Sequence, residues 1–199
     1  MRELVVASGN SGKIREMSHY LEPYGVKVIP QAVLGVSEPE EPALTFVENA
    51  LIKARHASTH TGRPALADDS GLCVEALAGE PGVQSARFAG EPKSDGANNQ
   101  KLLFALQGCT NRKAHYYCVM VYVRHARDPE PVIAEGRWYG EIAMHLKGDK
   151  GFGYDPLFYL PDYGLTAAQI DLDQKNRISH RAKAMANLIQ FFQNEWKDR

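Results

Sequence analysis

A short segment near the N-terminus, VVASGNSGKIREM (residues 5–17), constrains the fold of this chain more than any other feature. It opens with an apolar run typical of a buried strand, passes through a loop with two glycines, and continues with apolar residues at helical spacing. A strand joined to a helix by a glycine-rich turn gathers free backbone N–H groups and the positive end of the helix dipole at one point. The segment therefore predicts a βα unit whose turn can bind an anion.

The residue spacing of this turn does not match the Walker A P-loop. The Walker A pattern places four residues between its glycines and a Ser or Thr after its lysine, where the hydroxyl reaches magnesium. Here only two residues separate Gly9 from Gly12, and an isoleucine follows Lys13. A P-loop kinase or GTPase is therefore not expected. Two readings remain open: a phosphate-binding turn to which Lys13 adds charge, and a plain βα turn with a solvated lysine.

Beyond this unit, predicted strands first alternate with predicted helices, and the sequence then becomes rich in β-branched and aromatic residues. Thr45 and Glu48 have the spacing of a capping box, which predicts the start of a helix. In chain order, the predicted elements are strands at 3–8 and 26–30, the helix from Thr45, two short strands or one interrupted strand within 64–76, a helix at 96–108, β-rich segments at 115–125 and 132–146, and a last helix with Ser179 as its N-cap and Met185, Leu188, Ile189, Phe192 and Trp196 on one face. This order favours one α/β domain over residues 1–199, with a mixed central β-sheet flanked by helices.

The composition narrows the classes of protein to which the chain can belong. Its 199 residues are 44% hydrophobic and 24% charged, which is typical of a soluble globular protein. The net charge is −1, with lysines and arginines spread along the chain, so a binding surface for a nucleic acid polymer is not expected. A free nucleotide stays compatible, because one small anion needs only a few cationic side chains.

The cysteines and the lengths of the apolar runs indicate where in the cell the protein is expected. The three cysteines lack the spacing of a metal site, and Cys73 and Cys118 lie in apolar runs, so buried free thiols are expected there. No secretory signal pattern is recognisable, and no apolar run approaches the length of about 18 residues that a membrane span needs. The expected location is the cytoplasm, with no membrane partner.

Two adjacent acidic pairs, Glu40-Glu41 and Asp68-Asp69, are candidates for binding Mg²⁺ beside phosphates. Neighbouring residues in extended backbone point to opposite faces, so one member of each pair is expected to face a given site. The aspartate pair follows the apolar ALA at a predicted strand end, where open α/β sheets place their ligands. Turn chemistry for Asp68-Asp69 and a solvated loop for Glu40-Glu41 remain the alternatives.

The helix predicted from Thr45 places Asn49, Lys53 and His56 on one face. A lysine on that face could neutralise the charge of phosphates, whereas an ordinary solvated face is the alternative.

Two later segments carry candidate groups for a base. In GDKGFGYDPLF (148–158), an exposed aromatic such as Phe152 or Tyr154 could stack on a base, which contributes about 1–3 kcal/mol. In KNRISHRAK (175–183), an arginine beside a helix N-terminus offers a rigid donor fork for a base edge or a phosphate. A glycine-rich turn with core aromatics and a solvated basic turn are the respective alternatives.

The succession SGNSGK, EEPALTFVENALIKA, LADDSGL, GVQSARFAG, GFGYDP and SHR resembles the inosine/xanthosine triphosphate pyrophosphatase family of bacterial housecleaning enzymes. The six blocks occur in the family's order and span residues 8–181, and their combination is far more specific than any one of them. The resemblance implies an elongated, two-lobed α/β fold with a central substrate cleft, a homodimer and dependence on Mg²⁺. It also implies hydrolysis of dITP, ITP, XTP and dXTP to the nucleoside monophosphate and pyrophosphate, which keeps deaminated purines out of DNA and RNA.

The same resemblance implies roles for individual residues. Asp69 would be the proton acceptor that activates water, and Lys53 would support the phosphates. Glu40 and Asp69 would bind the metal, with Glu41 and Asp68 as the alternative ligands. The residues implied to bind the substrate are Ser8, Gly9, Asn10, Ser11, Gly12, Lys13, Ser70, Phe152, Gly153, Tyr154, Asp155, Lys175, His180 and Arg181.

Overall fold

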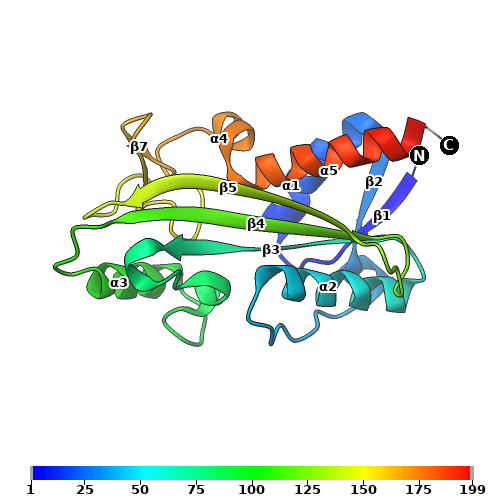
Figure 1. Ribbon diagram of the computed structural model, residues 1–199, viewed down its shortest axis with the longest axis horizontal. Coiled ribbons are helices and arrows are strands. Elements are labelled where there is room, and N and C mark those ends of the chain that lie inside the picture. The colour runs from blue at the N-terminus through cyan, green and yellow to red at the C-terminus, as the bar shows by residue number, and fades with distance from the viewer. Residues whose placement is uncertain (1, 198–199) are drawn as a thin grey trace. The chain divides into compact units, whose positions relative to one another are not determined.

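The computed structural model describes residues 2–197, with side chains through Glu195. Within this range, seven strands form one sheet in the order β2-β1-β3-β4-β5-β6-β7 (Figure 1). The strands are β1 (Arg2–Val6), β2 (Val26–Pro30), β3 (Ala65–Val74), β4 (Lys113–Val123), β5 (Val132–Ile142), β6 (Phe158–Leu160) and β7 (Leu165–Thr166). Both β2 and β3 pair with β1 in parallel, whereas β6 pairs antiparallel with β5 and with β7. The predicted α/β fold with a mixed sheet is confirmed.

The helices begin where the sequence supplies caps. Thr45 accepts a hydrogen bond from the backbone N–H of Glu48 at 3.3 Å, and Ser179 accepts one from Ala182 at 3.2 Å, as predicted. The longer helices are α1 (Ser11–Leu21), α2 (Phe46–Thr61), α3 (Asp95–Ala105), α4 (Leu172–Ile178) and α5 (His180–Lys197), and the short 3₁₀ helices are η1 (Glu22–Tyr24), η2 (Gln31–Leu34), η3 (Glu75–Leu77) and η4 (Gly82–Arg87). None of the helices within residues 2–197 is both long and apolar enough to span a membrane.

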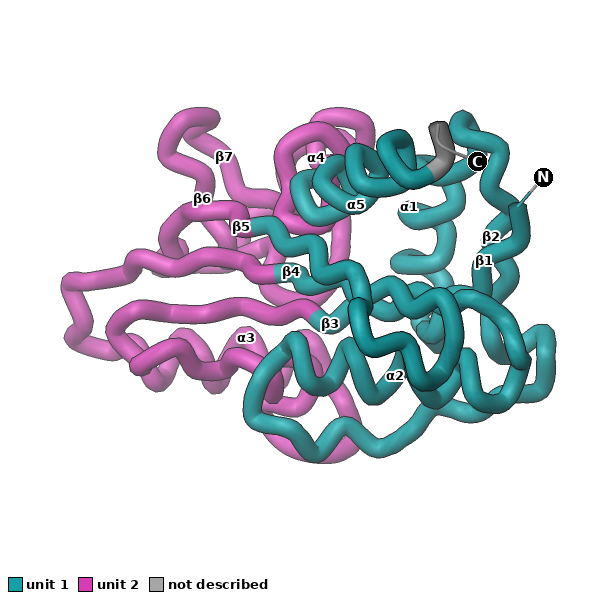
Figure 2. The backbone as a smooth tube through the Cα atoms, turned by 45° about the vertical axis from the view of Figure 1, so that its right-hand side comes forward, with its two compact units in different colours: residues 1–69, 118–136, 183–199 teal, residues 70–117, 137–182 magenta. Residues whose placement is uncertain are grey.

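Two compact units divide the chain (Figure 2). Unit 1 comprises residues 1–69, 118–136 and 183–199, and unit 2 comprises residues 70–117 and 137–182. The chain crosses from one unit to the other between Asp69 and Ser70, inside β3. A single domain over residues 1–199 stays a prediction.

Each unit has its own hydrophobic core. In unit 1, apolar side chains of β1, β3 and α1 pack with Met185, Leu188 and Phe192 of α5, three residues whose helical spacing predicted a buried face. Trp196, the last predicted member of that face, lies outside the residues whose side chains are described. In unit 2, Leu72 of β3 packs with residues of α3 and with Phe158 of β6.

The strand that carries the aspartate pair differs from the sequence prediction. Residues 65–74 form one uninterrupted strand, so Asp68 and Asp69 lie in the middle of β3 and not at a strand end. The backbone stays extended through the acidic residues because cationic side chains of unit 1 neutralise both carboxylates in place. Burial of nearly every residue of β3 shows that the strand is covered on both of its faces.

Truncation of a core residue of β3 tests the packing of unit 1. Leu66 is fully buried, and Leu66→Ala is expected to lower the free energy of unfolding by about 2–5 kcal/mol through lost burial and a residual cavity. Leu44, which is 90% exposed, provides the matched control, and Leu44→Ala should change the free energy by less than about 0.5 kcal/mol. Urea unfolding measures both variants, and equal losses would contradict this description of the core.

Candidate functional site

The glycine-rich turn after β1 holds an anionic oxygen. Asn10 caps α1 by accepting hydrogen bonds from the backbone N–H groups of Gly12 at 2.9 Å and Lys13 at 3.2 Å. The N–H of Gly9 donates to the carboxylate of Glu38 at 2.6 Å. The turn is therefore built to bind anions, and in this structure the protein's own carboxylate is the anion.

Each aspartate of β3 pairs with a lysine from a different helix. Lys13 of α1 forms an ion pair with Asp68 at 2.8 Å, and the Asp68 side chain is only 1% exposed. Lys53 of α2 lies 3.4 Å from Asp69 and 2.7 Å from Glu41. Neither lysine is simply solvated. The division of the pair between two helices follows from the alternation of side chains along a strand.

The predicted face of α2 contacts the acidic loop that precedes the helix. The side-chain amide of Asn49 accepts a hydrogen bond from the N–H of Ala43 at 3.0 Å and donates one to its carbonyl at 3.2 Å. A ring nitrogen of His56 lies 3.0 Å from the carbonyl oxygen of Ser37. Together with Lys53, these contacts hold the loop that carries the glutamate pair, so this face is not an ordinary solvated one.

The two glutamates of the loop differ in environment. Glu40 is exposed, whereas Glu41 is half-buried and bonded to Lys53 beside Asp69. The structure thus brings Glu41 and Asp69 to the same cation. The assignment of Glu40 as a metal ligand stays a prediction.

Burial and neighbouring charges shift the pKa values of Asp69 and Lys53. Removal from water raises the pKa of Asp69, and the nearby charges of Lys53 and Lys13 only partly oppose this. Burial lowers the pKa of Lys53, but the charges of Asp69, Asp68 and Glu41 outweigh it, so the net effect is a raised pKa. Lys53 therefore stays a cation, while Asp69 is a stronger proton acceptor than an exposed aspartate.

The donor set of unit 1 fits Mg²⁺. Among the described residues, no group of three or more His, Cys, Asp or Glu side chains converges as a metal cage. Mg²⁺ does not need one, because it is commonly held by one or two carboxylates together with substrate phosphates and water. Two carboxylates that already share one cation, Glu41 and Asp69, supply that set.

In unit 2, Asp155 organises the second group of candidate residues. Its buried carboxylate accepts hydrogen bonds from the N–H of Phe152 at 3.0 Å and the hydroxyl of Tyr116 at 3.4 Å, and it forms an ion pair with Lys175. Burial and the charge of Asp155 raise the pKa of Tyr116 well above its usual range, which keeps this hydroxyl protonated as a donor. Asp155 thus holds a loop and a lysine together through protein contacts.

The two aromatic candidates of this loop have different environments. Tyr154 is buried and donates a hydrogen bond from its hydroxyl to the carbonyl of Ser85 at 2.7 Å, so it is a core residue. Phe152 is 46% exposed, and the ammonium group of Lys175 lies 5.1 Å from its ring centroid. Phe152 is therefore the aromatic that can offer a ring face to a ligand.

The residues at the start of α5 are held by their neighbours in unit 2. Arg181 is buried and donates a hydrogen bond to the hydroxyl of Ser70 at 3.2 Å. The ring of His180 stacks on Tyr116, with centroids 4.8 Å apart and an interplanar angle of 10°, and more distantly on Trp138. Tyr116 and Trp138 show no local signal in the sequence beyond being two aromatics in predicted strands, because His180, their partner, lies far along the chain.

The structure therefore gathers the predicted site residues into two groups, one in each unit. Unit 1 contains Ser8, Gly9, Asn10, Ser11, Gly12, Lys13, Glu40, Glu41, Lys53, Asp68 and Asp69, and unit 2 contains Ser70, Phe152, Gly153, Tyr154, Asp155, Lys175, His180 and Arg181. Sequence reasoning missed Glu38 and Tyr116 as partners of these residues. Contacts of this kind join distant segments and leave no spacing pattern in the sequence.

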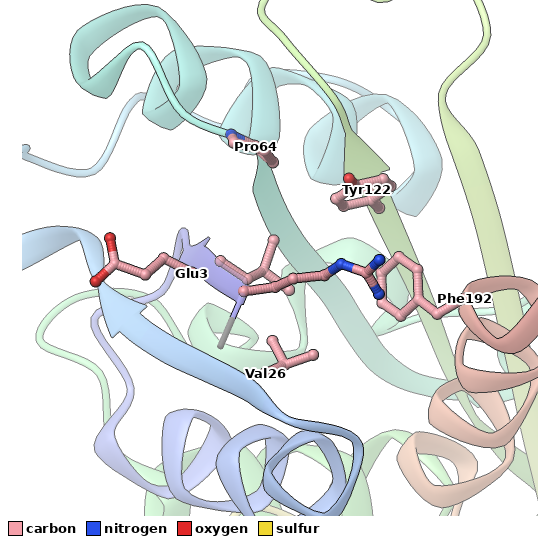
Figure 3. A pocket seen from close by; sticks show the side chains of 7 residues that line it. Glu3, Val26, Pro64, Tyr122 and Phe192 are labelled. Carbon is pink, nitrogen blue, oxygen red and sulfur yellow. The ribbon is translucent and has the colours of Figure 1, made fainter. Parts of the chain in front are cut away.

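A pocket of about 270 Å³ in unit 1 lies away from these residues (Figure 3). Its labelled lining residues are Glu3, Val26, Pro64, Tyr122 and Phe192. Glu3 belongs to the first half of β1, whereas the anion-binding turn follows the end of that strand. No predicted site residue lines the pocket.

Comparisons with known proteins agree on one family. The sequence profile of the Ham1 family matches residues 4–191. A protein of Nitrosomonas europaea called dITP/XTP pyrophosphatase is 59% identical over 190 residues, which cover 96% of this chain and 94% of that protein. A protein of the same name from Ralstonia nicotianae is 58% identical over 193 residues and 96% of each chain. The solved structure of a HAM1 protein from Coxiella burnetii superposes with a TM-score of 0.94 at 47% identity and covers 98% of this chain and 100% of that one.

Removal of the Lys53 charge should destabilise the protein. Lys53→Met leaves the Asp69 carboxylate buried without its main cation, so we expect the free energy of unfolding at neutral pH to fall by about 3 kcal/mol. This value is at the lower end of the range for breaking a buried ion pair, because Glu41, the other partner of Lys53, is partly exposed. The matched control is Lys27→Met, which removes an exposed pair with Glu3 and should cost less than about 1 kcal/mol.

The loss in Lys53→Met should also depend on pH. Without the lysine, the folded-state pKa of Asp69 rises further above its unfolded value, so ionised Asp69 opposes folding. The penalty is fully present above the folded-state pKa and disappears as the pH falls below the unfolded value. Urea unfolding from pH 7 down to pH 4 measures it, and a penalty that grows on acidification would contradict the assigned pairing.

Proposed function

This chain belongs to the Ham1 family, and from that premise we propose that it hydrolyses the deaminated purine nucleoside triphosphates dITP, ITP, XTP and dXTP. The products are the nucleoside monophosphate and pyrophosphate, and the benefit is that deaminated purines do not enter DNA or RNA. One observation carries the proposal at the level of chemistry: Lys53 joins Glu41 to Asp69 in the unit that also contains the anion-binding turn.

The groups of unit 1 suit the polyphosphate end of such a substrate. The N–H of Gly9 already donates to a carboxylate oxygen, and a phosphate oxygen is an equivalent acceptor. Lys13 and Lys53 provide the positive charge that a departing pyrophosphate needs. Their present partners, Asp68 and Asp69, hold both ammonium groups in position before the substrate arrives.

Asp69 is the proposed general base. Its raised pKa makes it a better acceptor of the proton that an attacking water must lose. Glu41 and Asp69 are the residues that we assign to Mg²⁺, with the exposed Glu40 adjacent in the loop. When bound, the ion supplies charge to the triphosphate and acidifies water.

The groups of unit 2 suit the base. Phe152 offers a ring face for stacking, and Arg181 and Lys175 offer hydrogen-bond donors. Hypoxanthine and xanthine carry an acceptor oxygen at position 6, where adenine carries a donor amine. A fixed Arg181 donor would favour the oxygen and oppose the amine, and one mismatched buried group costs about 1–3 kcal/mol.

Guanine requires a second criterion. It shares the oxygen at position 6 but adds a donor amine at position 2, where xanthine has an acceptor and hypoxanthine has only hydrogen. A site for both deaminated bases must therefore oppose a donor at position 2. Guanine presents this one mismatch, which corresponds to a discrimination of about 5- to 150-fold.

The proposed substrate also suggests a cellular location. We propose that the protein acts in the cytoplasm, where nucleotide pools are used. We also propose that it forms a homodimer and that its small-molecule partner is the nucleoside triphosphate substrate.

The role of Asp69 is tested by an isosteric substitution. Asp69→Asn keeps the shape of the side chain but cannot accept a proton, so we expect kcat for dITP to fall by about 10²–10⁴ while nucleotide binding stays measurable. Turnover is followed by pyrophosphate release with Mg²⁺, and binding by titration calorimetry. The exposed Asp162 provides a matched control, because Asp162→Asn should retain full turnover. Near-normal turnover in Asp69→Asn would rule out this residue as the base.

Substrate choice is tested by a panel of dITP, XTP, dGTP and dATP, with separate detection of pyrophosphate and orthophosphate. The wild-type protein should release pyrophosphate from dITP and XTP far faster than from the other two. Arg181→Ala should lower the selectivity for dITP over dATP by about 5- to 150-fold. The exposed Arg177 supplies the matched control in Arg177→Ala. Release of orthophosphate, or preference for dGTP or dATP, would overturn the proposed function, whereas unchanged selectivity in Arg181→Ala would overturn only the role of Arg181.

A further inference from the structure

A clamp from α3 holds Gly153, the residue between the two aromatics of the loop at 151–155. The backbone N–H of Gly153 donates to the carboxylate of Asp95 at 2.7 Å. Its carbonyl accepts a hydrogen bond from the side-chain amide of Asn99 at 2.8 Å. Two side chains that lie one helical turn apart on α3 therefore fix both the backbone N–H and the carbonyl of Gly153.

The clamp is itself rigid. The amide nitrogen of Asn99 also donates to the carbonyl of Asp95 at 2.8 Å, so the two side chains are tied to the same turn of α3. Asn99 is 4% exposed, and its buried side-chain oxygen has no hydrogen-bond partner within the described residues. A buried acceptor without a partner lowers stability, so this orientation of the side chain is unfavourable for its oxygen. It is, however, the orientation that lets the NH₂ group of Asn99 donate to the carbonyl of Gly153.

The loop needs such support because of its own composition. Gly151 and Gly153 both have positive φ angles, +76° and +62°, and they flank Phe152. A Cβ atom at Gly151 would lie 2.0 Å from the Asp155 carboxylate, so the turn has no room for a side chain there. Glycines give a loop this shape, but they also leave the free chain with many alternative conformations. The hydrogen bonds to Asp95 and Asn99 select one of them.

We propose that Asp95 and Asn99 are positioning residues for base binding, which fix the orientation of the Phe152 ring before a purine stacks on it. This inference rests on the proposed function and deepens it. Neither side chain has to contact the nucleotide. Their contribution is preorganisation, because a purine that binds a fixed ring does not have to order a glycine-rich loop.

Asn98 offers a contrast on the same helix. It is 2% exposed, and its side chain bonds to Ala89, Ser85 and Ala86, which belong to η4 and the segment after it. The adjacent Asn99 instead bonds to the loop that carries Phe152. The two asparagines thus support different segments, and only Asn99 bonds to Gly153, the residue that follows Phe152.

Kinetics should separate positioning from a general effect on stability. Asp95→Ala and Asn99→Ala should each raise KM for dITP about 5- to 10-fold, the order expected for one lost hydrogen bond that holds the loop. Because proton transfer and charge neutralisation belong to residues of unit 1, kcat should change by less than about twofold. Asp95→Asn keeps an oxygen that accepts the Gly153 N–H and should restore KM close to the wild-type value.

Two probes without turnover locate the effect. Titration calorimetry with dIMP, which carries the base, should report weaker binding in both alanine variants by the same factor as KM. Inhibition by inorganic pyrophosphate with Mg²⁺, which lacks the base, should be unchanged. The exposed Asn111 supplies the matched control, since Asn111→Ala should change neither constant.

The outcomes distinguish this inference from the proposed function. If the wild-type protein hydrolyses dITP but the alanine variants keep their KM and dIMP affinity, the positioning role is wrong and the proposed function stands. If dIMP and pyrophosphate binding weaken equally, the substitutions act on the whole fold, and the inference is again wrong. If the wild-type protein does not hydrolyse dITP, the proposed function fails and takes this inference with it.

Discussion

The ammonium group of Lys53 is the contact on which the chemistry of unit 1 depends. It lies between the half-buried Glu41 of the loop and the buried Asp69 of the sheet, and its positive charge permits the two carboxylates to approach each other. Asn49 and His56 on the same helix face bond to the backbone of the same loop, so α2 holds the segment that carries Glu41. The turn after β1 holds the same loop at a second point, because the N–H of Gly9 donates to Glu38.

Strand β3 connects the two kinds of chemistry in sequence. Its first half contributes Asp68 and Asp69 to unit 1, and the next residue, Ser70, accepts a hydrogen bond from Arg181 in unit 2. A polyphosphate calls for cations and backbone N–H groups, whereas a purine calls for a ring face and directed donors. The chain provides groups of the first kind in unit 1 and groups of the second kind in unit 2.

Local signals in the sequence were sufficient for much of this description. The cap at Thr45, the first βα unit and the shared face of Asn49, Lys53 and His56 all depend on residues within a few positions of each other, and the structure contains them as predicted. The break expected after Asp69 was wrong, because distant lysines neutralise the carboxylates and let the strand continue. Helix α4 and strands β6 and β7 were missed because each is too short to show a clear periodic pattern. Sequence reasoning did not reveal Asp95 and Asn99 as partners of the glycine loop because these contacts join segments more than fifty residues apart.

The contact between Glu38 and Gly9 has a consequence for how tightly any anion can bind at the first turn. The amide that would receive a phosphate already has an acceptor, supplied at a high effective concentration by the same chain. An incoming polyphosphate therefore exchanges one hydrogen bond for another, and the measured affinity reflects only the difference between them. Because Glu38 already occupies the N–H of Gly9, a single phosphate gains little binding free energy by displacing it. The turn therefore favours ligands that carry several negative charges over simple anions.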